Sequence, residues 1–243
     1  MADAQPTDGF YDPFPPSLPT DPRGFDRGSH GDGHAPSILP PDAYVDGKTI
    51  AQWTVDWWKW AAVQHTGSDA FTDTTGAYAG TGQQGHIFFL AGVAGNSSTG
   101  QALTDATRQF SVPGNDYLLV PLLNFINSQS TSPGETDAQL KSDNNGYVAM
   151  ISNLHLTVDG KSAPSSTLMQ LRESSPEFHT SFASDNPFGS PAGPTGDAFA
   201  DGYYAMLKPL GAGTHTIGFG GTFGGTFTTS VTDTITALPS HCG

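Results

Sequence analysis

The sequence predicts a mainly β protein, an antiparallel β-sandwich of the jelly-roll or immunoglobulin-like kind with one tryptophan-rich helix and one or two short helices. Short apolar or alternating segments recur between glycine-rich turns, which is typical of the strands of a sandwich. Helix signals are few by comparison. A length of 243 residues is sufficient for one large β domain with a sizeable core.

The first 45 residues are predicted to form an extended arm, followed by a single domain over residues 46–243. Pro and Gly recur every few residues in this arm, so neither a helix nor a strand is expected there. Four aromatic side chains lie between Phe10 and Phe25, too many for a purely solvated tail. We therefore expect part of residues 1–45 to lie along the domain or to mediate self-association with a neighbouring subunit.

The stretch Thr49–Gln64, TIAQWTVDWWKWAAVQ, is predicted to be the main helix. Thr49 and Gln52 form a capping-box pattern, in which each side chain accepts a hydrogen bond from the other residue's backbone N–H. Gly67 is a plausible stop just beyond the last turn. The helix is expected to pack on one sheet or to close one end of the sandwich.

All four tryptophans of the chain lie in this helix. On a helical projection, Trp53 and Trp57 point toward the apolar face and are predicted to anchor the helix to the sheet. Trp58 and Trp60 lie at the margins of that face. Any surface role of the cluster, such as stacking on the ring of a glycan, is therefore assigned to Trp58 and Trp60.

Six segments are predicted to be strands: His86–Leu90, Tyr117–Leu122, Leu154–Val158, Tyr203–Lys208, Thr214–Phe219 and Phe227–Ile235. Asp159-Gly160 is a favourable two-residue hairpin turn. The pairs Gly220-Gly221 and Gly224-Gly225 are expected to act as turns in the same manner. A second capping-box pattern, Ser132 to Glu135, predicts a short helix that runs to about Lys141.

The charge of the chain excludes some partners. Lys and Arg total 9 against 23 Asp and Glu, which gives a formal net charge of -14. So acidic a surface repels nucleic acid and disfavours anionic membranes, and no apolar run approaches the roughly 18 residues of a membrane span. The composition is more typical of an exported β protein than of a cytosolic enzyme. On this composition the expected location is extracellular or periplasmic, and the cytoplasm is the alternative because the N-terminus lacks a leader pattern.

Familiar local signatures of catalysis are absent from the sequence. It contains no G-x-S-x-G elbow, no H-E-x-x-H, no P-loop and no H-x-E with paired cysteines, and its single cysteine is Cys242. No catalytic residue is therefore assigned. No cofactor is predicted, and a divalent or transition metal is the one alternative. The absence of these signatures favours a non-enzymatic protein.

The histidines are the main candidate ligands for a metal ion. His86, His155, His179 and His215 lie on or beside predicted strands, so sandwich packing is able to bring two or three of them together. By alternation, His86 and His215 are expected to point inward and His155 to face solvent. The alternative is that an inward histidine is a hydrogen-bonded core residue.

A few charged residues complete the candidate set. Arg108 and Arg172 are each expected to pair with a buried carboxylate or to bind an anion, and the structural ion pair is the favoured interpretation. The carboxylates with a candidate acid/base role are Asp73, Glu173, Asp197 and Asp201. The predicted ligand-binding residues are Trp58, Trp60, Asp73, Arg108, Arg172 and Asp201.

Several segments, taken in order, resemble those of a known family. They are the W-W-x-W helix at Trp57–Trp60, the stretch Gln84–Gly92, the R-x-x-x-V-P-G stretch Arg108–Gly114 and the G-T-H-T-I stretch Gly213–Ile217. The chain is similar in these segments to a family of uncharacterised, usually exported bacterial proteins. The resemblance spans about Thr49 to Ile235, and it implies export and a single domain but no reaction.

The chain departs from that family in two respects. Members of the family often carry cysteines where this chain has Ala79 and Phe110, so the resemblance implies that a disulfide is missing here. The acidic, proline-rich arm has no counterpart in the family.

The leading hypothesis is an exported β-sandwich that acts by binding or assembly rather than by catalysis. One alternative is a metal-dependent enzyme, a hydrolase or oxidase that uses histidine ligands on an extracellular polymer. A second alternative is a carbohydrate-binding module.

Overall fold

The computed structural model describes residues 36–96, 101–102 and 104–239. Every described residue belongs to one compact unit, Gly33–Gly243. Residues 1–35 of the predicted arm, and with them the predicted self-association, lie outside the described residues.

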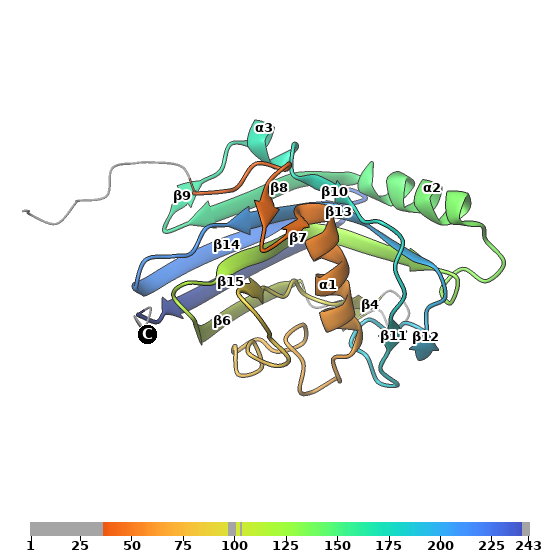
Figure 1. The fold of residues 1–243 in the computed structure, drawn as a ribbon, viewed down its shortest axis with the longest axis horizontal. Helices are drawn as coiled ribbons and strands as arrows, with labels where there is room; N and C mark the ends of the chain where they lie inside the picture. The colour runs from red at the N-terminus through yellow and green to blue at the C-terminus, as the bar shows by residue number, and fades with distance from the viewer. Residues whose placement is uncertain (1–35, 97–100, 103, 240–243) are drawn as a thin grey trace, which may run out of the picture. The chain divides into compact units, whose positions relative to one another are not determined.

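Two sheets form a sandwich, so the predicted fold class is confirmed (Figure 1). The first has the strand order β10 (Arg172–Ser174), β13 (Ala198–Leu207), β7 (Tyr117–Ser128), β3 (Ile87–Phe89). The second has the order β6 (Asp105–Val112), β15 (Phe227–Ala237), β14 (Gly213–Phe223), β8 (Ile151–Val158), β9 (Lys161–Ser162). Pairing is antiparallel except for β3 with β7 and β6 with β15, so each sheet carries one parallel edge pair.

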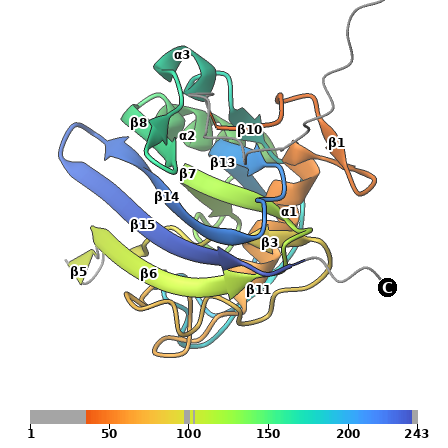
Figure 2. The same ribbon diagram turned by 90° about the vertical axis from the view of Figure 1, so that its left-hand side faces the viewer.

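Helix α1 (Ile50–Ala62) forms a third layer on the outer face of the four-stranded sheet (Figure 2). Successive side chains of a strand point to opposite faces, and β13 shows this clearly. Tyr204 and Met206 belong to the core beneath α1, whereas Tyr203 and Ala205 belong to the core between the sheets. Every residue of β13 is buried because both of its faces are covered.

The start of α1 matches its prediction. The Gln52 amide donates to Thr49 Oγ1 at 3.2 Å, and the Thr49 amide donates to Gln52 Oε1 at 2.9 Å, which confirms the capping box. The helix ends at Ala62, with Val63 as its C-terminal cap.

The tryptophans are buried differently from the prediction. Trp57 is buried as expected, with its indole N–H 2.8 Å from the Leu90 carbonyl oxygen. Trp58 and Trp60 are buried too, whereas Trp53 is only partly buried. Trp58 and Trp60, expected at the margins of the apolar face, are thus not available for the surface role assigned to them, and the inward position expected for Trp53 is only partly realised.

Loops from distant parts of the sequence explain this difference. The ring of Phe71 lies 5.3 Å from that of Trp60, and the ring of Phe188 lies 5.6 Å from that of Trp58. The two loops cover the margins of the helix that a projection of α1 alone leaves open. Trp58 also donates to the hydroxyl of Tyr204 at 3.0 Å, inside the core.

The second helix, α2 (Asp137–Val148), begins later than predicted. Gly134 has a φ of +91°, so the stretch from Ser132 forms a turn rather than a first helical turn. Thr136 is the N-cap, and its amide donates to Gln139 Oε1 at 2.9 Å. A one-turn helix, α3 (Ser165–Leu168), follows β9.

The glycine pairs play two different roles. Asp159 and Gly160 have φ values of +51° and +74° and join β8 to β9, which confirms the predicted hairpin turn. Gly224-Gly225 likewise lies in the turn between β14 and β15. Gly220-Gly221 is not a turn. It lies at a bulge within β14, where a Cβ on Gly220 would come within 2.0 Å of the Thr229 carbonyl oxygen.

Part of the predicted arm lies along the domain, as expected. Ile38 bridges to Leu207, and the Leu39 amide donates to the Met206 carbonyl oxygen at 2.8 Å. The remaining strands form two-residue pairs: β1 (Tyr44–Val45) with β2 (Lys48–Thr49), β4 (Gly95–Asn96) with β5 (Gln101–Ala102), and β11 (Ser181–Phe182) with β12 (Gly193–Pro194). Within the described ranges, no helix combines the length and apolar character of a membrane span.

Candidate functional site

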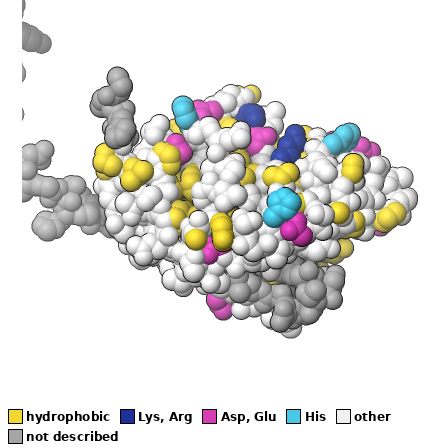
Figure 3. Space-filling view, turned by 90° about the horizontal axis from the view of Figure 1, so that it is seen from below, with side chains coloured by type: hydrophobic (Ala, Val, Ile, Leu, Met, Phe, Trp, Pro, Cys, Tyr) yellow, Lys and Arg dark blue, Asp and Glu magenta, His cyan; other side chains and the backbone are white. Residues whose placement is uncertain are grey.

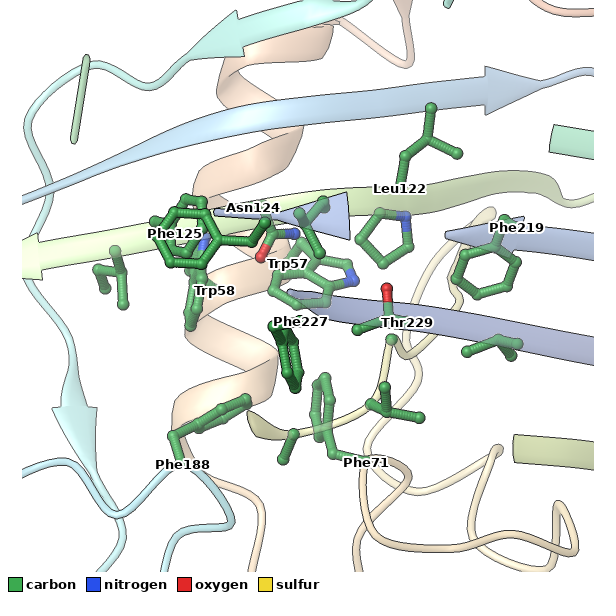
Figure 4. A pocket seen from close by; sticks show the side chains of 18 residues that line it. Trp57, Trp58, Phe71, Leu122, Asn124, Phe125, Phe188, Phe219, Phe227 and Thr229 are labelled. Atoms are coloured by element: carbon green, nitrogen blue, oxygen red, sulfur yellow. The ribbon is translucent and has the colours of Figure 1, made fainter. Parts of the chain in front are cut away.

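A cavity of about 240 Å³ lies where α1, β7 and the β14–β15 hairpin meet (Figure 4). Aromatic rings supply much of its wall. Trp57 and Trp58 come from α1, Phe71 and Phe188 from the two loops that cover this helix, and Phe227 from the start of β15. The Trp57 ring lies 5.0 Å from that of Trp58 and 5.6 Å from that of Phe71, both edge-on, so packing fixes the orientation of these rings.

A bulge in β7 explains why a cavity forms at this place. Tyr203 of β13 pairs with Leu123, but the next residue, Tyr204, pairs with Pro121, which leaves Leu122 as an extra residue. Pro121 has no N–H to donate to a partner strand, and a bulge bends the strand that carries it. Residues 118–122 before the bend are buried, and of these only Pro121 and Leu122 reach the cavity, whereas residues 123–126 after it are half-buried and all line the cavity.

Two polar side chains face this apolar space. Asn124 extends from β7 and Thr229 from β15, and Figure 4 shows their polar groups directed toward the same space around Trp57. Neither side chain forms a hydrogen bond with another residue of the described ranges. An apolar wall with a few convergent polar groups is the usual construction of a small-molecule site.

Arg108 supports the loop at the edge of the cavity. It is 3% exposed and donates to the carbonyl oxygens of Ala91 at 2.5 Å, Gly92 at 2.8 Å and Asp73 at 2.9 Å. Residues 92–94 of this loop line the cavity. The guanidinium is therefore committed to backbone carbonyls and does not itself line the cavity.

Asp233 supplies the buried carboxylate that the favoured interpretation of Arg108 requires. Its Oδ1 lies 3.8 Å from Arg108 Nη1, too far for a hydrogen bond, and neither carboxylate oxygen has a hydrogen-bond partner among the described residues. Burial raises the pKa of Asp233 to about 7, although the charge of Arg108 acts in the opposite direction. The pair is an ion pair inside the sandwich, which is the favoured interpretation of Arg108.

Asp73 has a local structural role. Its carboxylate accepts hydrogen bonds from the Thr75 amide at 2.7 Å and from the Tyr78 amide at 2.8 Å. Burial acts to raise the pKa of Asp73, but these hydrogen bonds outweigh it and the pKa is lowered. Asp73 thus closes the turn whose carbonyl oxygen accepts from Arg108.

Arg172 and Asp201 form a second ion pair, on neighbouring strands β10 and β13. Nε and Nη2 of Arg172 lie 2.9 and 2.7 Å from the two oxygens of Asp201, a bidentate geometry. Ser174 donates to Asp201 at 2.9 Å, and the group borders a polar cavity of about 310 Å³ beside α2. This cavity shares no lining residue with the aromatic one, so the predicted ligand-binding residues do not form one site.

Glu173 points to the other side of β10. It is half-buried, and burial raises its pKa to about 7. Because successive residues of a strand face opposite ways, Glu173 does not share a face with Arg172 and Ser174. It therefore belongs to neither the ion pair nor the polar cavity.

The four candidate histidines do not gather at one point in the described part of the chain. His86 precedes β3 with a side chain that is 68% exposed, 3.8 Å from Asp46, so the expectation that it points inward is wrong. His155 is half-buried in β8, opposite Gly220 of β14. His179 is exposed between β10 and β11.

His215 is half-buried, but at the end of β14 rather than inside the core. Its Nδ1 lies 2.8 Å from Asp159 Oδ2, and its Nε2 lies 2.7 Å from the Gly211 carbonyl oxygen. Desolvation acts to lower the pKa of His215, but the hydrogen bonds to Asp159 and Gly211 raise it overall. Figure 3 shows histidines beside acidic side chains on the face that it displays, which is consistent with ion-pairing rather than mutual clustering.

The residues that build the aromatic cavity were absent from the predicted set, apart from Trp58. Phe71 and Phe188 lie in loops far apart in the sequence, and no local pattern connects them with α1. Asn124 gave the one usable signal, as a polar residue in the otherwise apolar run LLVPLLNFI. Thr229 gave none, because threonine is frequent throughout β15.

No known protein matches this chain closely enough to identify the site. No family model matches the chain, and no curated protein or solved structure matches it either.

Proposed function

We propose that this protein is a binding protein that holds a small, mostly apolar molecule in the aromatic cavity. The carrying observation is the combination of a wall of aromatic rings with two polar side chains, Asn124 and Thr229, that have no partner within the described residues. Burial of an apolar ligand supplies affinity there, and a single hydrogen bond fixes its orientation.

The volume of the cavity limits the size of the ligand that it can hold. A volume of about 240 Å³ lies below the usual range of roughly 300–1,000 Å³ for sites that hold drug-sized molecules. A molecule of one or two rings with one hydroxyl or carbonyl group fits these dimensions and the two polar groups. A small phenol meets both conditions.

The charged groups near the cavity support binding rather than catalysis. Arg108 and Asp233 lie behind the loop of residues 91–94 and do not line the cavity. Chemistry in the cavity would require an ionisable group within reach of the bound molecule. The lining groups that are polar, Asn124 and Thr229, are suited to orienting a ligand.

The proposal is tested by calorimetric titration with p-cresol and with toluene, two molecules of similar size of which only p-cresol carries a hydroxyl group. We expect saturable 1:1 binding of p-cresol and weaker binding of toluene. Phe227→Ala removes a lining ring and should weaken both. Phe110→Ala is the matched control, because Phe110 is also half-buried in the five-stranded sheet but does not line the cavity. Equal binding by the two variants would overturn the proposal.

Export and assembly remain part of this proposal. The composition and the resemblance to exported bacterial proteins support an extracellular or periplasmic location. Residues 1–45 offer the segment for self-association, of which only residues 36–45 are described. Glycan binding by Trp58 and Trp60 has lost its motivation, because both side chains are buried.

A further inference from the structure

Three side chains with metal-ligating atoms lie together at the edge of the domain, away from the aromatic cavity. They are Glu177, His179 and Asp197, and one ligand atom from each lies within 4.8 Å of the other two. His179 was among the predicted metal ligands. Its neighbours here are two carboxylates, however, and not the other histidines.

The backbone explains why these three side chains meet. Phe178 and Ala198 form an antiparallel bridge with two hydrogen bonds of 3.0 Å, and both are buried. Alternation directs Glu177 and His179, one on each side of Phe178, away from the core. Antiparallel pairing places Asp197 directly across from His179 on the same outer face.

The separations suit a shared ion. His179 Nε2 lies 2.8 Å from Asp197 Oδ1 and 3.8 Å from Glu177 Oε1. Nitrogen and oxygen ligands at about 2.1 Å from one ion lie about 3.0–3.4 Å from each other in octahedral or tetrahedral geometry. Small side-chain rotations of the exposed Glu177 and His179 would bring both distances into that range.

Asp197 is held in place by a further residue. Gln129 Nε2 donates to Asp197 Oδ2 at 2.9 Å, and the Asp197 amide donates to Gln129 Oε1 at 3.1 Å. The adjacent Gly196 has a φ of +66°, and a Cβ there would come within 2.5 Å of Gln129 Oε1. Gln129 thus occupies one oxygen of Asp197 and leaves the other, Oδ1, facing His179, as a supporting residue does at a metal site.

We propose that Glu177, His179 and Asp197 bind a divalent first-row transition ion, for which Zn²⁺ is the probe. One imidazole nitrogen with two carboxylate oxygens is a donor set for such an ion, whereas Ca²⁺ prefers oxygen ligands alone. Two carboxylates also match the charge of a dication. The exposure of Glu177 and His179 leaves coordination positions open for water or a second molecule.

The competing explanation is an ion pair without a metal, and the chain provides a matched control for it. His65 Nδ1 lies 2.5 Å from Asp185 Oδ1, and both residues are exposed, but among the described residues no third ligand joins this pair. If a histidine beside a carboxylate on this acidic surface were sufficient for binding, His65 would bind zinc as well as His179.

The test is calorimetric titration of the chelator-treated full chain with Zn²⁺ at pH 7. His30, His34, His241 and Cys242 lie outside the described residues, so the titration uses a background with His30→Ala, His34→Ala, His241→Ala and Cys242→Ser. We expect one site per chain, weakened at least tenfold by His179→Ala and by Asp197→Asn and unchanged by His65→Ala. Gln129→Ala should weaken binding less than either ligand substitution.

One further measurement makes the outcome decisive. Circular dichroism of each variant without metal checks that it is folded. We expect all variants to fold, because the three ligands lie outside the core. The absence of a zinc site, or equal binding by the His179→Ala and His65→Ala variants, would overturn the proposal. Neither result bears on the aromatic cavity.

Discussion

The stretches of strand β7 on either side of its bulge, residues 118–120 and 123–126, are both mostly apolar but have different surroundings. Residues 118–120 in the first half are fully buried inside the packed layers, whereas residues 123–126 in the second half are half-buried and line the aromatic cavity. Both halves are mostly apolar. The bulge around Leu122 separates them, so a backbone irregularity rather than composition determines which half packs and which half is open to a ligand.

This comparison predicts that substitutions in the closed region act on stability and those in the open region act on binding. The largest effect is expected for Trp57→Ala, since Trp57 anchors α1 and also borders the cavity. Loss of a buried aromatic ring of this size destabilises a protein by about 3–5 kcal/mol. Urea unfolding followed by circular dichroism measures this. A loss below about 1 kcal/mol would show that α1 is not anchored through Trp57.

The second prediction compares the two halves directly. Leu118→Ala, in the closed half, should reduce the free energy of unfolding by about 2–5 kcal/mol, because it leaves a new void in a dense core. Leu123→Ala, in the open half, should reduce it by less, because Leu123 already borders a cavity. Urea unfolding of the two variants side by side is the measurement. Equal losses would remove the distinction between the halves.

The third prediction concerns Asp233, which pairs with Arg108 behind the open half. Its pKa is raised from 3.8 to about 7 in the folded protein by burial. The folded state therefore retains a proton that the unfolded state releases, so this group makes stability fall as the pH rises from about 4 to 7. Asp233→Asn removes the titration. The stability of the variant relative to the native protein should increase between pH 5 and pH 8, as measured by urea unfolding at both values. A difference that stays constant with pH would contradict the raised pKa.

The smallest effect is expected at the polar groups of the cavity. Asn124→Ala or Thr229→Val removes one hydrogen bond to a bound phenol, worth about 0.5–1.5 kcal/mol, while the free energy of unfolding changes little. The affinity for p-cresol should then approach that for toluene. Calorimetry with both molecules tests this, and Thr228→Val is the control, because Thr228 is the neighbour of Thr229 and does not line the cavity. Unchanged selectivity in both cavity variants would show that these groups do not orient the ligand.

The sequence predicts the sandwich and its main helix well because their signals are local. The capping box of Thr49 and Gln52 and the turn at Asp159-Gly160 depend on neighbouring residues only. The ion pair of Arg108 could be expected because an arginine that becomes buried requires a counter-charge. Its partner, Asp233, could not be identified, because it is supplied by the parallel pairing of β6 with β15.

The candidate sites depend on contacts between distant segments, and local patterns cannot give these. A projection of α1 leaves Trp58 and Trp60 at the margins of the apolar face, because it contains no information on the loops of Phe71 and Phe188 that cover them. His179 was grouped with other histidines, whereas the pairing of Phe178 with Ala198 brings it to Asp197. In each case the residue type indicated the kind of contact that the side chain makes, but the residue that it contacts could not be predicted, because that residue is distant in the sequence.

The indole N–H signals of the four tryptophans in a proton–nitrogen correlation spectrum test the binding site most directly. Trp57 and Trp58 line the cavity, whereas Trp53 and Trp60 of the same helix do not. Titration with p-cresol should shift the signals of Trp57 and Trp58 in a saturable manner and leave those of Trp53 and Trp60 nearly unchanged. A titration that moves none of the four signals, or only those of Trp53 and Trp60, would contradict the assignment of the aromatic cavity as the ligand site.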